Sequence, residues 1–451
     1  MVTDSPHVHK FQLFNHQIEA ISCWKANGCK GILSMATGTG KTYTAIGALD
    51  EVLQSNKMLF TAISVPYAHL MDQWLDSIKK YGLDLDYTIK CFSENTNWHQ
   101  ELKKVIRKMK IGQFKNVLII STHTTMVSEK MNKLIDELKN QNIATMIIGD
   151  EVHGLGSEKR RENLSELFEY RLGLSATPKR MYDEIGNRFL HRYFGDVVYE
   201  FSLCKAIDKL NPATYRTYLT PYYYFPYICT LTSKETEEYN EITRKILQKI
   251  SRLDDITYDD IESDEEIKRL LIIRSKIIKA AKEKINILKN ILADIKVRFG
   301  EVNHTIIFTD DRLITETLKL LHAGGFIAVK FTQELNIDQR NLIIDQFEKG
   351  TIDVLVAMKI LDEGVDIPNA KIAVLMSSTS NPREYIQRLG RILRIYDGKD
   401  YAYIYDIVVK PAYIPDDLFK LENTVFKVEK ERVKLIAECA LNYKEAIEKI
   451  S

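Results

Sequence analysis

The sequence predicts an α/β protein with two parallel-sheet domains in tandem, a helical insertion and a short helical C-terminal tail. Three observations lead to this prediction. Short apolar runs alternate with amphipathic segments over about the first 200 residues, the alternation stops near residue 214, and it resumes near residue 305. Because the runs are continuously apolar, their strands are expected to be buried on both faces, as in a parallel sheet that helices cover on each side.

The expected strands follow the apolar runs in order. In the first domain they are 31–35, 58–65, 116–122, 145–151 and 170–177, with helices such as 41–54 and 67–81 between them. Residues 214–231 are tyrosine-rich and contain two prolines, which favours strands or a crossing connection. In the second domain the expected strands are 305–310, 327–332, 352–358, 371–378 and 401–409.

A length of 451 residues is long for one core, so two or more domains are expected. We place the first domain at 1–205 and the second at 206–415, with the charged helical segment 233–297 inside the second. Residues 416–451 are rich in lysine and glutamate, and they are expected to form the helical tail.

The net charge of +1 excludes a whole-molecule basic field, so any site for a polyanion must be local. No apolar run approaches 18 residues, so no membrane partner is expected. The N-terminus "MVTDSPHVHKFQ" lacks the basic-then-apolar order of a signal peptide, which favours a cytoplasmic protein.

A glycine-rich loop lies between an expected strand and an expected helix in "GILSMATGTGKTYTAI". Glycines allow the backbone to turn so that N–H groups face phosphate oxygens, the lysine then reaches the outer phosphates, and the following hydroxyl binds Mg²⁺. An ordinary glycine turn is the alternative, since Met35 stands where the first glycine of such loops usually lies. The residues expected to bind nucleotide are Thr37, Gly38, Thr39, Gly40, Lys41 and Thr42.

An acidic pair ends the buried run in "ATMIIGDEVHGLGS". The carboxyl end of a strand is where open α/β sheets bind ligands. We expect Asp150 to hold Mg²⁺ together with Thr42, and Glu151 to orient and polarise the attacking water. A structural role for the pair is the alternative.

The segment "QRLGRILR" concentrates arginines in an expected helix. At 100° per residue, Gln387, Arg391 and Arg394 fall within about 60° of one another. Ile386, Leu389 and Leu393 form a separate apolar stripe that can pack on the sheet. A solvated charged helix face is the alternative.

These motifs, in this order, resemble those of superfamily 2 helicases. "MATGTGKT", "DEVH", "LGLSATP", "TIIFTD", "LVAMKILDEGVDIPNA" and "QRLGRILR" match, and "FQLFNHQIEAI" resembles the Q motif, whose glutamine, here Gln17, reads adenine. The resemblance implies two RecA-like domains that close on one ATP, with Gln387 in the catalytic set and Arg391 and Arg394 as arginine fingers. It also places Gly364 near the nucleotide and Asp366 in contact with the nucleotide or the arginine fingers, and a plain turn is the alternative for this segment.

The resemblance assigns two further roles in the first domain. Ser175 and Thr177 of "LSATP" would couple the ATP state to the domain interface. Segments 64–74 and 120–126 would contact the nucleic-acid backbone, since loops that carry hydroxyls and free N–H groups suit phosphate contacts.

"DEVH" and "QRLGRILR" are more similar to the motifs of XPB-type repair helicases, phage recombination helicases and restriction-enzyme motor subunits than to those of DEAD-box proteins. The resemblance therefore implies an ATP- and Mg²⁺-dependent helicase or translocase acting on duplex or branched DNA in repair, recombination or defence. A nuclease, if one takes part, would be a different protein. The alternatives are a DNA-stimulated ATPase that acts as a switch in a larger complex, with the tail as its docking surface, and an RNA helicase.

Overall fold

The computed structural model describes residues 11–178, 183–212, 214–250, 264–332, 334–358, 367, 369–377, 382–418 and 430–450. The chain forms two compact units. The first extends to Ala206 and includes Asn211–Tyr215, and the second comprises Ile207–Leu210 and the chain from Arg216 onward. The domain boundaries expected from the sequence stay predictions, and each unit has its own sheet and core.

The first unit contains a seven-stranded parallel sheet with the order β3-β4-β2-β5-β6-β1-β7. Side chains of its interior strand β2 are all buried, which explains why the sequence there is largely apolar. The strands are β1 (Lys30–Met35), β2 (Leu59–Val65), β3 (Tyr87–Cys91), β4 (Asn116–Thr122), β5 (Ala144–Gly149), β6 (Tyr170–Ser175) and β7 (Val197–Phe201).

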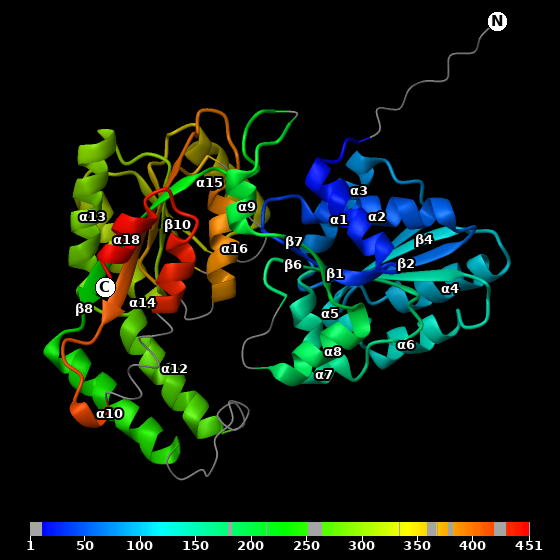
Figure 1. Ribbon diagram of the computed structural model, residues 1–451, viewed down its shortest axis with the longest axis horizontal. Coiled ribbons are helices and arrows are strands. Elements are labelled where there is room, and N and C mark those ends of the chain that lie inside the picture. The colour runs from blue at the N-terminus through cyan, green and yellow to red at the C-terminus, as the bar shows by residue number, and fades with distance from the viewer. Residues whose placement is uncertain are drawn as a thin grey trace, which may run out of the picture. The chain divides into compact units, whose positions relative to one another are not determined.

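Helices cover both faces of this sheet, with α1, α2 and α3 on one side and α4, α6 and α8 on the other (Figure 1). Large apolar side chains of the second group, among them Leu102, Ile106 and Phe194, pack with the strands in one core. The helices are α1 (Asn15–Ala26), α2 (Lys41–Ser55), α3 (Leu70–Tyr81), α4 (Trp98–Lys110), α5 (His123–Met126), α6 (Glu129–Asp136), α7 (Glu158–Arg161), α8 (Glu184–Phe194) and α9 (Leu203–Asp208), with the 3₁₀ turn η1 (Val152–Gly156).

The second unit contains a six-stranded parallel sheet with the order β10-β11-β9-β12-β13-β8. The tyrosine-rich segment therefore supplies β8, an edge strand that pairs with β13 along its whole length. The strands are β8 (Tyr222–Thr230), β9 (Thr305–Phe308), β10 (Ala328–Phe331), β11 (Val354–Ala357), β12 (Ile372–Leu375) and β13 (Ala402–Lys410).

The segment 233–297 is helical in its described part. α13 packs on the sheet through Leu288, Ile291 and Ile295, whereas α10 and α12 lie against each other as a pair. The helices of the unit are α10 (Ser233–Ile250), α12 (Glu265–Lys279), α13 (Lys284–Phe299), α14 (Asp311–Ala323), α15 (Ile337–Glu348), α16 (Pro382–Ile392) and α18 (Tyr443–Glu448), with the 3₁₀ turn η3 (Asp416–Leu418). The predicted fold class, two parallel-sheet domains with a helical insertion, is confirmed.

The described part of the tail docks on the second unit. Arg432 Nη1 lies 2.9 Å from Oδ2 of Asp406, and both side chains are almost fully buried. The Tyr224 hydroxyl donates to the same oxygen at 2.7 Å. Because separating a buried ion pair leaves an uncompensated charge, this contact fixes the tail to β8 and β13.

None of the helices in the described ranges is long and apolar enough to cross a membrane.

Candidate functional site

The glycine-rich loop connects β1 to α2 through a backbone that favours glycine. Gly38 has φ 90° and Gly40 has φ 87°, both in the left-handed region. A Cβ atom on Gly40 would also lie 2.4 Å from Gln17 Nε2. Because α2 begins at Lys41, the loop ends at a helix N-terminus, where unpaired backbone N–H groups favour anions.

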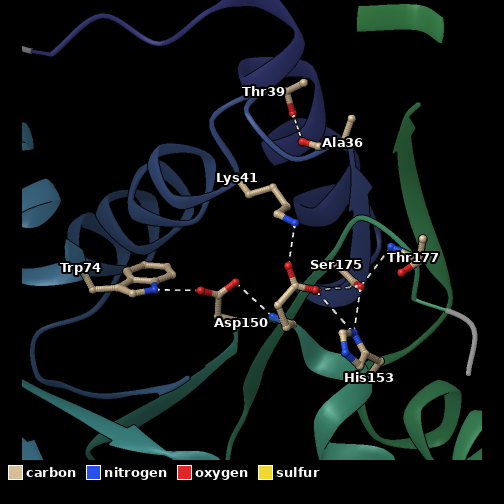
Figure 2. Close-up of polar contacts among 9 residues, drawn as sticks. Ala36, Thr39, Lys41, Trp74, Asp150, His153, Ser175 and Thr177 are labelled. Atoms are coloured by element: carbon tan, nitrogen blue, oxygen red, sulfur yellow. Dashed lines mark hydrogen bonds and ion pairs between the residues drawn. The ribbon is translucent and has the colours of Figure 1, made fainter. Parts of the chain in front are cut away.

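Two threonines of the loop have different surroundings. Thr39 Oγ1 donates to the Ala36 carbonyl at 2.7 Å (Figure 2). The Thr39 carbonyl accepts from His16 Nε2 at 2.9 Å, so Thr39 holds the shape of the loop. Thr37 Oγ1 is buried and has no hydrogen-bond partner among the described residues. A buried hydroxyl without a partner suits a ligand that brings one, and this fits a phosphate or its metal.

Gln17 lies at the start of α1 against this loop. Its Oε1 accepts from the Phe14 amide at 2.8 Å, and its Nε2 donates to the Gly40 carbonyl at 3.0 Å. The side chain is buried, so in this structure it joins α1 to the glycine-rich loop. The adenine contact expected of Gln17 stays a prediction.

The lysine of the loop meets the acidic pair at the carboxyl end of β5. Lys41 Nζ lies 3.1 Å from Glu151 Oε1 (Figure 2). Asp150 Oδ1 accepts from the Glu151 amide at 3.0 Å, and Oδ2 accepts from the indole N–H of Trp74 at 3.0 Å. Both carboxylates and the lysine thus come together at the carboxyl end of β5, where the acidic pair was expected from the sequence.

Glu151 has a strained backbone. Its φ of 45° and ψ of 54° lie in the left-handed region, which costs a non-glycine residue about 1–3 kcal/mol. Such strain persists only where neighbours hold it, and η1 starts at the next residue. From this backbone the Glu151 side chain reaches Lys41, whose Nζ donates to Oε1.

The motif "LSATP" adjoins this carboxylate on β6. Glu151 Oε2 accepts from the Ser175 hydroxyl at 3.4 Å and lies 3.4 Å from His153 Nδ1. Ser175 Oγ in turn accepts from the Thr177 amide at 3.1 Å. A continuous polar path therefore leads from Lys41 through Glu151 to Thr177.

Burial and the neighbouring Glu151 raise the pKa of Asp150, and the Lys41 charge and the Trp74 N–H only partly oppose this. A carboxyl group in this setting binds a proton or a cation more readily than an exposed one. Asp150 and the Thr42 hydroxyl, which belongs to the first turn of α2, are oxygen donors of the kind that Mg²⁺ prefers, and their expected role as its ligands stays a prediction.

The arginine helix of the second unit differs from the expectation in one respect. α16 ends at Ile392, so Arg394 lies two residues beyond the helix, and the face that it is expected to share with Gln387 and Arg391 stays a prediction. The Leu393 carbonyl accepts from the Thr220 amide at 2.7 Å, and the Arg394 carbonyl accepts from the Thr220 hydroxyl at 3.1 Å. These contacts turn the chain away from the helical path.

Lys399 adds a buried positive charge at the same helix end. Its ammonium donates to the carbonyls of Ile392 and Arg394. A cation satisfies the last carbonyls of a helix and complements its dipole. The position of Arg394 therefore depends on Lys399 and Thr220.

The buried arginine of the motif is Arg388, which the sequence analysis did not single out. Its Nη1 donates to the Ser377 carbonyl at 3.3 Å, and its guanidinium lies 5.5 Å from the centre of the Phe308 ring. The apolar stripe is present at Leu389 and Leu393, both buried. Gln387 and Arg391 are partly buried, and their catalytic roles stay predictions. Gly364 and Asp366 lie outside the described residues.

Two family models match the chain. The model described as "Type III restriction enzyme, res subunit" matches residues 10–180, and "Helicase conserved C-terminal domain" matches residues 283–396. The chain is similar to the DNA 3'-5' translocase XPB2 of Sulfurisphaera tokodaii, with 29% identity over 89% of this chain and 82% of that protein. It is 24% identical to Putative helicase 22 of a Sulfolobus islandicus filamentous virus, over 88% of this chain and 64% of that protein.

Solved structures support the same fold. The Type ISP restriction-modification enzyme LlaBIII bound to DNA matches with a TM-score of 0.60 and 16% identity, over 95% of this chain and 30% of that enzyme. The Hef helicase domain of Pyrococcus furiosus matches with a TM-score of 0.54 and 16% identity, over 92% of this chain and 98% of that domain. The chain thus spans less than a third of the larger of these two proteins.

Proposed function

The chain belongs to the superfamily 2 helicases and translocases, enzymes that hydrolyse ATP, and we propose that it uses this hydrolysis to move along or remodel DNA. The observation that carries the proposal is that Lys41, Asp150 and Glu151 come together at the carboxyl ends of the strands of the first sheet. The relative from Sulfurisphaera tokodaii is named as a DNA translocase, and the restriction-modification enzyme LlaBIII is bound to DNA in its solved structure. Both favour DNA over RNA as the substrate.

Each residue of the site has a role in the proposal. The loop amides and Lys41 bind the phosphates of ATP, and Gln17 lies beside the loop to contact the base. Glu151 orients the attacking water and accepts its proton. Arg391 and Arg394 stabilise the charge that develops on the transferred phosphoryl group.

Mg²⁺, held by Thr42 and Asp150, would neutralise charge on the phosphates. Because burial and Glu151 raise the pKa of Asp150, a nearby cation would favour the ionised form of this carboxyl group. Trp74 and the Glu151 amide each donate to one carboxylate oxygen of Asp150, which would orient this carboxylate as a metal ligand.

A triplex-displacement assay tests the proposed movement. We expect the protein to displace the third strand from duplex DNA in the presence of ATP and Mg²⁺, and the Lys41→Ala variant to fail. DNA-stimulated hydrolysis without displacement would contradict translocation and support a switch. Stimulation by RNA that exceeds stimulation by duplex DNA would contradict the choice of substrate.

A further inference from the structure

One guanidinium connects the segment after β4 to the acidic motif. Arg160, in α7, donates from Nη1 to the Gly154 carbonyl at 3.0 Å and from Nη2 to the Thr124 hydroxyl at 3.4 Å. Thr124 lies in the segment 120–126, which we expect to contact DNA. Gly154 lies three residues after Glu151 in η1. The side chain of Arg160 therefore spans from the expected DNA-binding segment to the turn that carries the catalytic carboxylate.

A buried histidine makes a second connection between the same two places. His123 Nδ1 lies 2.7 Å from Ser64 Oγ at the end of β2. A Cβ atom on Gly154 would lie 2.9 Å from His123 Cδ2 and 3.1 Å from Nε2, so the imidazole packs directly on the backbone of Gly154. A glycine is required there because any side chain would collide with this ring.

Gly154 and Glu151 belong to one hydrogen-bonded turn. The Gly154 amide donates to the Glu151 carbonyl at 2.9 Å. Glu151 holds a strained left-handed backbone, and a conformation of this kind persists only while its neighbours support it. A shift of residues 122–126 would reach Gly154 through Arg160 and His123, and would then change the direction of the Glu151 carboxylate.

We propose that Arg160, together with His123, couples DNA binding by residues 120–126 to the placement of Glu151, and that Arg160 is a positioning residue for DNA-stimulated hydrolysis. The inference rests on the proposed function, because it requires that this segment binds DNA. It goes beyond that function by assigning the stimulation of hydrolysis by DNA to one junction of the first unit, formed by Arg160, His123 and Gly154. In this inference Arg160 acts on Glu151 through the Gly154 carbonyl.

The test compares Arg160→Ala with Lys159→Ala, a control that removes a lysine of the same helix whose side chain is exposed. Turnover is measured without DNA and at saturating duplex DNA, and the DNA dissociation constant is measured by fluorescence anisotropy. For Arg160→Ala we expect the ratio of stimulated to basal turnover to fall about tenfold, a size typical of coupling between sites. Basal turnover and DNA affinity should stay within about threefold of the wild type.

Thr124→Val removes the other end of the same bond and keeps the inference testable if Arg160→Ala does not fold. It should also lower the ratio, and the double variant should be no worse than the more impaired single variant, because the two residues share one interaction. A ratio that both variants preserve, or a loss that weaker DNA binding fully explains, would overturn the inference. A wild-type enzyme that DNA does not stimulate would overturn the proposed function itself.

Discussion

Lys41 and Glu151 bind each other in the first unit, with Nζ 3.1 Å from Oε1 and side chains that are only 11% and 19% exposed. In the proposed reaction the lysine binds phosphate and the glutamate orients water, so the pair must separate when ATP enters. Phosphate oxygens carry more charge than one carboxylate, so they can replace Glu151 as the partner of the ammonium. The contact thus keeps Glu151, the proposed general base, paired with Lys41 until nucleotide binds.

Replacement of Lys41 tests this pair. Lys41→Ala removes the phosphate contact and leaves two carboxylates side by side with no cation, so we expect ATP turnover, measured as phosphate release, to fall at least about 100-fold. Lys25→Ala, which removes an exposed lysine that pairs with Glu51, is the control and should behave as the wild type. Near-normal turnover of Lys41→Ala would contradict the proposal that this loop binds the phosphates of ATP.

Trp74 is expected to set the affinity for Mg²⁺. Trp74→Phe keeps a buried ring but removes the N–H that donates to Asp150 Oδ2. Loss of such a hydrogen bond to a metal ligand typically lowers metal affinity about 10- to 100-fold. We therefore expect a higher Mg²⁺ concentration for half-maximal turnover and for binding of a fluorescent nucleotide. Trp98→Phe, at the start of α4, is the matched control, and equal Mg²⁺ titrations for the two variants would contradict the role of Trp74.

Alanine substitutions of two arginines in one motif are expected to impair different properties, hydrolysis for Arg394 and stability for Arg388. Arg394→Ala should leave nucleotide binding and thermal stability near wild type and lower DNA-stimulated hydrolysis by about 10³ or more, since it removes charge stabilisation. Arg388→Ala should lower the free energy of unfolding by about 1–3 kcal/mol, because its guanidinium is buried against Phe308 and Ser377. Nucleotide binding, phosphate release and thermal melting separate the two results. An Arg394→Ala enzyme with unchanged turnover would show that this residue takes no part in the hydrolysis.

The strands and the loop of the first unit could be predicted because their signals are local. A continuously apolar run marks a strand buried on both faces, and a glycine before a lysine marks the phosphate loop. β3 and β7 lie at the sheet edges, where the polar residues Lys90 and Glu200 interrupt the apolar run. The sequence analysis therefore did not predict these two strands.

Contacts between distant residues explain the other differences. Trp74 and Asp150 are 76 positions apart, and nothing in either segment points to the other. The end of α16 depends on Thr220, 174 positions before Arg394, so helical periodicity extended the helix too far. Regular spacing also could not distinguish the buried Arg388 from its neighbours Arg391 and Arg394.

Because His123 is buried, we expect the folded state of the first unit to lose stability in acid. Burial, with smaller contributions from the charges of Arg160 and His153, lowers the pKa of His123 from about 6.5 to about 3. Between these values the unfolded chain binds a proton that the folded chain does not, so stability is present above about pH 6.5 and is lost as the pH falls. From pH 6.5 to 5 the loss from this residue is about 2 kcal/mol.

A comparison of variants isolates this contribution. His123→Gln cannot titrate, so its free energy of unfolding, measured by urea denaturation at pH 7.5 and 5, should decrease by about 2 kcal/mol less than that of the wild type. His191→Gln replaces an exposed histidine beside Asp196 and should keep the wild-type pH dependence. If His123→Gln lost as much stability as the wild type on acidification, His123 would already be accessible to protons in the folded chain. The ring could then not be sealed between Ser64 and the backbone of Gly154, as the coupling through this junction requires.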